Sequence, residues 1–273
     1  MRAGWNERAP TRLPPLTAGD RLRLALRGAW ACGALVLLFP LFLLARGVDL
    51  GLERVAGRPV SRLGPRVVRL WAAQALPSLG LGYVAHGTPM QGAGAFVANH
   101  SSWIDIVALQ RAAAPFLVSK AEVRDWPGIG FVGRAIGTMF IDRRPAEAKR
   151  QEAMLLARLG RGDRMALFPE GTSSDGLRVL PFKSTLFGAF FAPGRPPGLA
   201  VQPVTIRYRP GPGLPPDFYG WWGEMDFGPH ARDVLARSRG VVELTFHPPL
   251  RLADFADRKA LALAAREAVR AGF

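Results

Sequence analysis

The segment Asn99–Asp105 holds the densest group of side chains that could do chemistry in this sequence of 273 residues. It reads Asn-His-Ser-Ser-Trp-Ile-Asp and directly follows the apolar run Ala95–Ala98. A carboxylate five residues after His100 can return to the imidazole where the chain turns between them. That contact would fix the tautomer and leave the second ring nitrogen free as a general base. The pattern predicts a histidine–aspartate pair, and the alternative is a helix-capping turn, with Ser101 or Ser102 as the cap, around an incidental histidine.

Two further polar clusters also follow apolar runs that are typical of strands. In Phe168–Ser174, Glu170 and Thr172 flank Gly171, which permits close backbone approach by a ligand's polar head. In Phe140–Arg144 the paired arginines suit a phosphate or a carboxylate. Each cluster alone is equally typical of a solvated turn. Three in order, each after a predicted strand, favour a binding site.

These clusters resemble the sequence blocks of the glycerolipid acyltransferase family, the 1-acylglycerol-3-phosphate acyltransferases and their lyso-lipid relatives. Four blocks match in the family's order over roughly residues 80–210: NHSSWID, GTMFIDRR, FPEGTSS and VQPVTIRY. The resemblance implies transfer of a fatty acyl group from acyl carrier protein or coenzyme A to the hydroxyl of a lyso-lipid. It also implies that His100 is the base and Asp105 its orienting partner. The expected acceptor-binding residues are Arg143, Glu170, Gly171, Thr172, Lys120 and Lys183.

The sequence departs from the family pattern at Ser173. The third block of the family usually has an arginine there, which is expected to hold the acceptor's phosphate, and Lys183 could supply the missing charge. Further on, Trp221–Met225 resembles a stretch of the lyso-ornithine lipid acyltransferase branch, whose acceptor would need fewer cations. The predicted acceptor is 1-acylglycerol-3-phosphate, as the family default, and the alternative is a lyso-ornithine lipid.

The chemistry predicted for the site is direct attack of the acceptor hydroxyl on the thioester. The sequence has no G-x-S-x-G elbow, and its single cysteine, Cys32, lies in an apolar run, which argues against an acyl-enzyme. Its four histidines include no two at metal-ligand spacing. We therefore expect neither a metal nor a cofactor.

The N-terminal region carries a candidate membrane anchor. Gly28–Ala45 is uncharged, contains Pro40 and is bounded by Arg27 and Arg46. As a helix it would rise about 27 Å, at the short end of what crosses a hydrocarbon core of ~30 Å. A second apolar patch, Val67–Val84, follows. Arginines on every flank favour a helical pair dipping into one leaflet over a single span, and a buried core helix is the alternative.

The charge balance also favours a membrane partner. The net charge is +15, and residues 1–69, with twelve arginines and four acidic residues, contribute +8 of it. This charge brackets an apolar run, which suits anionic lipid headgroups better than nucleic acid. The predicted location is the inner (cytoplasmic) membrane, with the active site facing the cytoplasm. A nucleic-acid-binding protein and a membrane scaffold without catalysis are the rival interpretations.

The elements that must position these residues alternate between short apolar runs and amphipathic stretches. Such alternation predicts an α/β fold, a mixed sheet flanked by helices. The expected domains are a membrane-anchoring helical region, 1–85, and a catalytic domain, 86–273. The expected strands are Ala95–Ala98, Phe116–Val118, Thr138–Ile141, Met165–Phe168, Val201–Tyr208 and Val241–Phe246. The expected helices are Ile104–Ala113, Ile129–Ile136, Pro145–Leu159, Thr185–Phe191 and Asp254–Arg270.

Overall fold

The computed structural model describes residues 9–60, 63–142 and 144–273. Over these residues the chain forms an eight-stranded mixed sheet in the order β1-β7-β6-β2-β5-β3-β4, with β8 beside β6. The strands are β1 (Leu81–His86), β2 (Gly94–Ala98), β3 (Phe116–Lys120), β4 (Met139–Ile141), β5 (Arg164–Leu167), β6 (Ala200–Pro210), β7 (Gly240–Phe246) and β8 (Leu250–Arg251). Strand β2 runs parallel to both of its neighbours, β5 and β6, whereas β6 and β7 are antiparallel. The predicted α/β architecture is confirmed.

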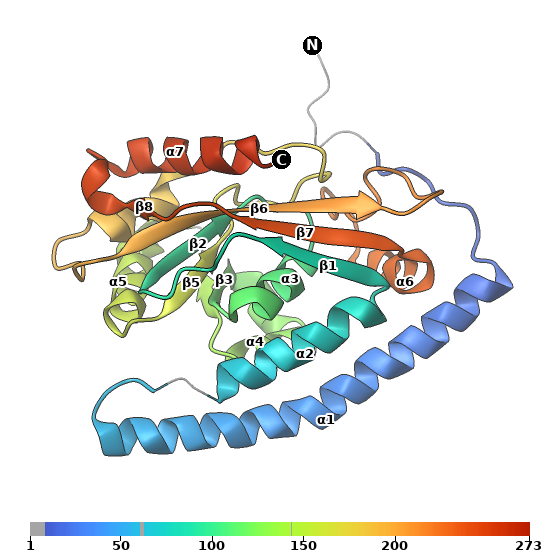
Figure 1. Cartoon of the computed structure of the whole chain (residues 1–273), viewed down its shortest axis with the longest axis horizontal. Coiled ribbons are helices and arrows are strands. Elements are labelled where there is room, and N and C mark those ends of the chain that lie inside the picture. The colour runs from blue at the N-terminus through green and yellow to red at the C-terminus, as the bar shows by residue number, and fades with distance from the viewer. Residues whose placement is uncertain (1–8, 61–62, 143) are drawn as a thin grey trace, which may run out of the picture.

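Helices cover both faces of the sheet (Figure 1). The helices are α1 (Ala18–Ala56), α2 (Gly64–Ser78), α3 (Ile104–Ala113), α4 (Ile129–Ala135), α5 (Ala148–Gly160), α6 (Phe227–Arg237) and α7 (Arg258–Ala271). Short 3-10 helices are η2 (Ala121–Asp125), η3 (Pro145–Glu147), η4 (Ser184–Phe191) and η5 (Leu252–Asp254). Helices α2 and α3 lie on one side of the sheet, and α7 lies on the other.

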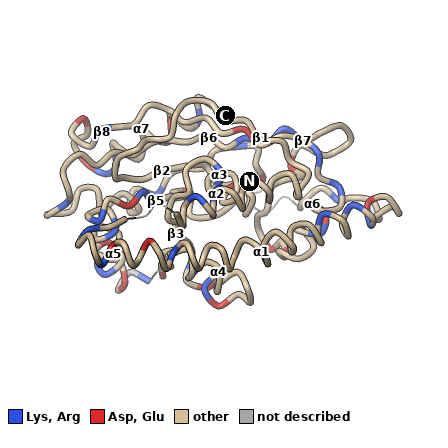
Figure 2. The backbone as a smooth tube through the Cα atoms, turned by 60° about the horizontal axis from the view of Figure 1, so that its bottom comes forward, with Lys and Arg blue, Asp and Glu red and all other residues tan. Residues whose placement is uncertain are grey.

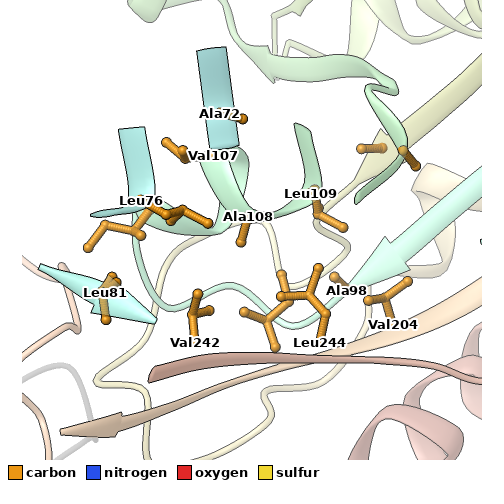
Figure 3. Close-up of a cluster of buried hydrophobic side chains, with 14 of the residues drawn as sticks. Ala72, Leu76, Leu81, Ala98, Val107, Ala108, Leu109, Val204, Val242 and Leu244 are labelled. Atoms are coloured by element: carbon orange, nitrogen blue, oxygen red, sulfur yellow. The ribbon is translucent and has the colours of Figure 1, made fainter. Parts of the chain in front are cut away.

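The hydrophobic core has two parts, one on each face of the sheet. On the face that carries α2 and α3, Leu76 and Leu109 pack toward Leu81, Val242 and Leu244 of the sheet (Figure 3). On the opposite face, apolar side chains of α5, η4 and α7 pack against β2, β5 and β6. Because each strand alternates its side chains between the two faces, the central strands are apolar on both sides and their ends are held rigidly.

The six predicted strands are all present, with bounds shifted by one or two residues. Of the expected helical pair, the second segment, Val67–Val84, is helical only in part, because α2 ends at Ser78 and the chain enters the sheet as β1. Ala72, Ala75 and Leu76 are buried in the core, so this face of α2 packs on the protein instead of on lipid. The sheet therefore begins ahead of the expected domain boundary at 85/86. Helix α6 and strands β1 and β8 were not predicted.

The long N-terminal helix is mostly exposed, with four buried residues among its 39. Over 39 residues α1 is long and apolar enough to cross a membrane, and only 11% of its most apolar 18-residue window is buried. A capping box between Thr17 and Asp20 begins the helix, which runs on through Pro40. Its charged residues lie toward its two ends (Figure 2).

Polar contacts fix α1 to the domain at both ends. Near its start, Arg23 and Arg27 donate to the backbone carbonyls of Ala236 and Leu235 in the last turn of α6. Near its end, the buried carboxylate of Asp49 accepts the backbone N–H groups of Leu63 and Gly64, which begin α2. These contacts satisfy orphan groups at two helix ends, and they hold α1 along the domain (Figure 1).

Candidate active site

The histidine predicted as a base stands where β2 ends and α3 begins. His100 Nδ1 lies 2.8 Å from Asp105 Oδ2, and the exposed fractions of the two side chains are 19% and 0%. The imidazole stacks on the ring of Phe168, with 4.1 Å between the ring centroids. The predicted contact between the two side chains is therefore present, with the carboxylate inside the protein and the imidazole partly open to solvent.

The Asp105 carboxylate is held by four hydrogen bonds. Besides His100, its Oδ2 accepts the backbone N–H groups of Ser101 and Ser102 at 2.7 and 2.9 Å, and its Oδ1 accepts the hydroxyl of Tyr208 at 2.5 Å. The expectation that Ser101 or Ser102 caps α3 is wrong, because neither hydroxyl has a hydrogen-bond partner among the described residues. The carboxylate in the first helical turn instead reaches back to the amides of the two residues ahead of Trp103, the N-cap, and so fixes the turn that leads into α3.

Tyr208, at the end of β6, is the functional candidate that the sequence alone did not single out. Burial raises the pKa of its hydroxyl well above the usual value, and the negative charge of Asp105 raises it further, so the group remains a neutral donor. Its ring stacks on Tyr219, with 5.1 Å between the centroids. The alternation of side chains along a strand could have indicated its position, because Tyr208 shares one side of β6 with the buried Val204 and Ile206.

Hydrogen bonds to backbone groups tie the loop Asn99–Trp103, called here the catalytic loop because it carries the candidate base, to its neighbours. The buried Asn99 side chain bonds both the N–H and the C=O of Ile206, at 2.8 Å each, and so joins the end of β2 to β6. The carbonyl of His100 accepts the N–H of Ser174 at 2.9 Å, and that of Ser101 accepts the N–H of Trp221 at 2.8 Å. The loop conformation is therefore set by segments far apart in the sequence.

The second polar cluster lies directly beside the histidine, in the loop after β5. Glu170 is buried, and its Oε1 accepts the backbone N–H of Leu180 at 3.0 Å. Burial, as the largest cause, raises the pKa of its carboxyl to about 8, so the group is protonated at neutral pH. Gly171 has φ +72°, and a Cβ there would meet the Lys183 side chain, whose Nζ would lie only 2.7 Å away. The positive φ therefore favours glycine here, and the exposed Lys183 side chain crosses directly over it.

The remaining predicted acceptor residues follow the order of the strands. Strands β2, β5, β3 and β4 are neighbours in that order in the sheet. His100 follows β2 and Glu170 follows β5. The exposed Lys120 ends β3, and Asp142 and Arg144 follow β4. Thr172, half-buried, donates to the carbonyl of Ser173 at 3.4 Å. Arg143 lies outside the described residues. The carboxyl ends of these parallel strands bring the predicted residues to one edge of the sheet, where α/β folds bind their ligands.

Aromatic side chains form one side of this edge. Trp126 contacts Trp221 and Phe227, and Phe227 contacts Trp103 at the start of α3. The Trp103 indole N–H donates to Nδ1 of His230, a buried imidazole whose pKa burial lowers to about 4. His230 is therefore neutral and serves as a hydrogen-bond acceptor. Across the described chain, no group of three or more histidine, cysteine, aspartate or glutamate residues is arranged to hold a metal ion.

The chain thus combines a mixed α/β sheet, a histidine–aspartate pair at the carboxyl edge of that sheet, and a long apolar helix. The family model described as Acyltransferase matches residues 83–207. The chain is 46% identical over 264 residues to a lyso-ornithine lipid O-acyltransferase of Rhodobacter capsulatus, covering 96% of this chain and 94% of that protein. This protein therefore belongs to the glycerolipid acyltransferase family, as the sequence blocks indicated.

Other relatives carry two different acceptor names. A lyso-ornithine lipid O-acyltransferase of Pseudomonas aeruginosa is 35% identical over 92% of this chain and 93% of its own length. A 1-acyl-sn-glycerol-3-phosphate acyltransferase of Neisseria gonorrhoeae is 33% identical over 60% of each chain. The crystal structure of the 1-acyl-sn-glycerophosphate acyltransferase PlsC of Thermotoga maritima shares the fold, with a TM-score of 0.64 at 21% identity over 93% of this chain and 95% of that one.

The protein is thus an acyltransferase of the lysophospholipid type, and the prediction of acyl transfer is confirmed at this level. Its family and its apolar helix α1 indicate association with a membrane. The acceptor predicted first, 1-acylglycerol-3-phosphate, has support from the more distant relatives. The relatives that match more of the chain at higher identity carry the name of the alternative acceptor.

Proposed function

We propose that this protein transfers a fatty acyl group from a thioester to the hydroxyl of a lyso-ornithine lipid. The observation that carries the proposal is the 46% identity to a lyso-ornithine lipid O-acyltransferase over nearly the whole of both chains. Ser173 supports it, because a serine stands where an arginine for the acceptor's phosphate would be expected. An ornithine headgroup carries one carboxylate and one ammonium group, and it needs no cation cluster for a phosphate.

We propose that His100 is the general base and Asp105 its orienting partner. Asp105 fixes the proton on Nδ1, and Nε2 takes the proton from the acceptor hydroxyl as the oxygen attacks the thioester carbonyl carbon. The tetrahedral intermediate then expels the thiolate, which the imidazolium protonates. Acid–base catalysis of this kind contributes about 10²–10⁴-fold. Asp105, anchored by Tyr208 and two backbone amides, stabilises the imidazolium without moving.

The acceptor headgroup is proposed to bind at the loops after β3, β4 and β5. Lys183 crosses Gly171 beside the catalytic loop, where its ammonium suits the headgroup carboxylate. Lys120, Arg143 and Thr172 are proposed as further acceptor contacts. Glu170, which is buried and neutral, is proposed to shape this site by holding the backbone of Leu180.

The membrane arrangement is proposed to be monotopic, at the cytoplasmic face of the inner membrane. Helix α1 would measure about 58 Å, far more than a ~30 Å hydrocarbon core requires, and it lies along the domain (Figure 1). Residues 1–85 are proposed as the anchoring region and 86–273 as the catalytic domain, with β1 at their junction. Both proposed donors, acyl carrier protein and coenzyme A thioesters, would then reach the site from the cytoplasm.

The test is an assay of the purified protein against lyso-ornithine lipid and 1-acylglycerol-3-phosphate, with acyl carrier protein and coenzyme A thioesters as donors. We expect the highest kcat/KM for lyso-ornithine lipid. Because selectivity is a ratio of catalytic efficiencies, both acceptors must be compared in one preparation and one detergent. A higher kcat/KM for 1-acylglycerol-3-phosphate would refute the proposed acceptor.

A further inference from the structure

Helix α4 carries a small apolar surface that the protein leaves uncovered. The α4 tip, Trp126–Phe131, joins η2 to the first turns of α4. Phe131 is 57% exposed and Ile129 is 39% exposed, whereas Gly130 between them is buried against the backbone of Arg124. Two large apolar side chains therefore point outward from a short, tightly packed turn.

This tip is continuous with the apolar surface of α1. The ring of Phe131 contacts that of Phe39 in α1, with 5.5 Å between the centroids. Other large apolar side chains in the same part of α1 are exposed, namely Leu35, Val36, Leu37, Leu41, Leu43 and Leu44. The two helices thus present one apolar surface, although α4 belongs to the catalytic domain.

Basic side chains stand around the tip, together with the exposed acidic side chains of Glu122 and Asp125, and the Asp125 carboxylate lies 3.5 Å from the Arg124 guanidinium. Arg124 and Arg134 are exposed on either side of it, and Arg134 donates to the carbonyl of Arg124 at 2.7 Å. Lys120, also exposed, precedes η2. Apolar side chains at the centre with arginine and lysine at the rim are typical of a surface that enters the headgroup region of a bilayer, because the long basic side chains reach anionic headgroups.

The tip also contacts the candidate active site. The Trp126 ring lies 6.1 Å from that of Trp221, whose backbone N–H donates to the carbonyl of Ser101 in the catalytic loop. The loop that leaves α4 leads into β4, at whose end Asp142 and Arg144 stand. Any surface on which the tip rests therefore lies at the edge of the acceptor site.

We propose that the α4 tip is a second membrane contact, inserted beside α1 into the same leaflet, so that the acceptor site opens at the lipid headgroups. This inference rests on the proposed function, in which the acceptor is a membrane lipid. A lyso-lipid could then pass from the leaflet to His100 without leaving the bilayer surface.

A fluorescent label tests the contact directly. The single cysteine is first removed as Cys32→Ser, and the label is attached to Phe131→Cys or, as a control, to Leu263→Cys on α7, which is 59% exposed on the other side of the sheet. The protein is bound to phosphatidylglycerol–phosphatidylcholine vesicles with brominated acyl chains. We expect quenching at position 131 and none at 263. An unquenched label at 131, or failure of the protein to bind the vesicles, would overturn the inference.

Activity provides a second readout. With the acceptor embedded in vesicles, Ile129→Ser/Phe131→Ser should lower kcat/KM about tenfold, and Leu263→Ser should not change it. With a monomeric short-chain acceptor, the double variant should equal the wild type. An equal loss with the monomeric acceptor would mean that the tip binds substrate instead of the bilayer. Quenching at 131 in a protein that acylates no lyso-lipid would refute the proposed function alone.

Discussion

The two sides of the candidate active site differ in how tightly the protein holds them. On the catalytic side, Asp105 is fully buried and accepts four hydrogen bonds. On the acceptor side, Lys183 is an exposed long side chain. A buried, fully bonded carboxylate has one position, whereas an exposed lysine has many rotamers. We infer that the proposed reaction depends on the rigidly held His100–Asp105 pair, whereas the proposed choice of acceptor depends on a few charged side chains at the rim.

The largest expected effect is on the catalytic side. His100→Ala should lower kcat by about 10²–10⁴-fold, because the proposed base that accepts the hydroxyl proton is lost. Because the pair acts as one unit, His100→Ala/Asp105→Ala should be little slower than His100→Ala alone. Single-turnover assays and vesicle binding of each variant measure this. Near-normal turnover by His100→Ala would refute both the base assignment and the contrast between the two sides.

A smaller effect is expected at Tyr208, which donates a hydrogen bond to Asp105. Tyr208→Phe removes one of the hydrogen bonds that orient the carboxylate, and it should lower kcat about tenfold with little change in KM. Tyr219→Phe is the matched control, because this stacked tyrosine bonds Ser238 and the carbonyl of Arg239 and makes no contact with Asp105. Steady-state kinetics of the two variants separate positioning from packing. Equal losses in both would assign Tyr208 a packing role only.

On the acceptor side, Ser173→Arg should change selectivity more than rate. The new guanidinium would favour a phosphate, so the ratio of kcat/KM for 1-acylglycerol-3-phosphate to that for lyso-ornithine lipid should rise about fivefold. Ser173→Gln, of similar length but neutral, controls for size. A fall in both rates with an unchanged ratio would show that position 173 does not face the headgroup.

The last and smallest effect concerns Glu170, which lies between the two sides. It is an effect on the pH dependence of stability instead of on turnover. Burial raises its pKa from 4.5 to about 8, so the folded state binds a proton that the unfolded state releases. This contribution to the free energy of unfolding is full below about pH 4.5 and is lost as the pH rises through about 8. Glu170→Gln should flatten this fall, and Glu267→Gln, at a half-exposed position on α7, should not. Urea unfolding at several pH values measures the slope.

Much of the catalytic side could be predicted from the sequence because its contacts are local. The five-residue spacing of His100 and Asp105 requires only a turn after an apolar strand, and the structure has that turn. The six predicted strands followed from apolar runs whose pattern does not depend on their partners. Long-range contacts could not be read in this way. Val67–Val84 is a largely apolar segment, and only packing against α3 and the sheet shows that its buried side chains face the protein.

By itself, then, the sequence determined the strand–helix alternation, the apolar helix near the N-terminus and the pairing of His100 with Asp105, since each depends on residues close together in the chain. Only the tertiary structure decided which groups complete the pair. Tyr208 reaches Asp105 across 103 positions, and Asn99 joins β2 to β6 across 107. Tertiary structure also raised the pKa of the Glu170 carboxyl by burying it, and it placed the Phe131 ring against Phe39 of α1. Segments far apart in the chain become buried and adjacent only when the sheet assembles. Burial then shifts the pKa of Glu170, and contact between distant segments orders the Asp105 carboxylate and joins the apolar surfaces of α1 and α4.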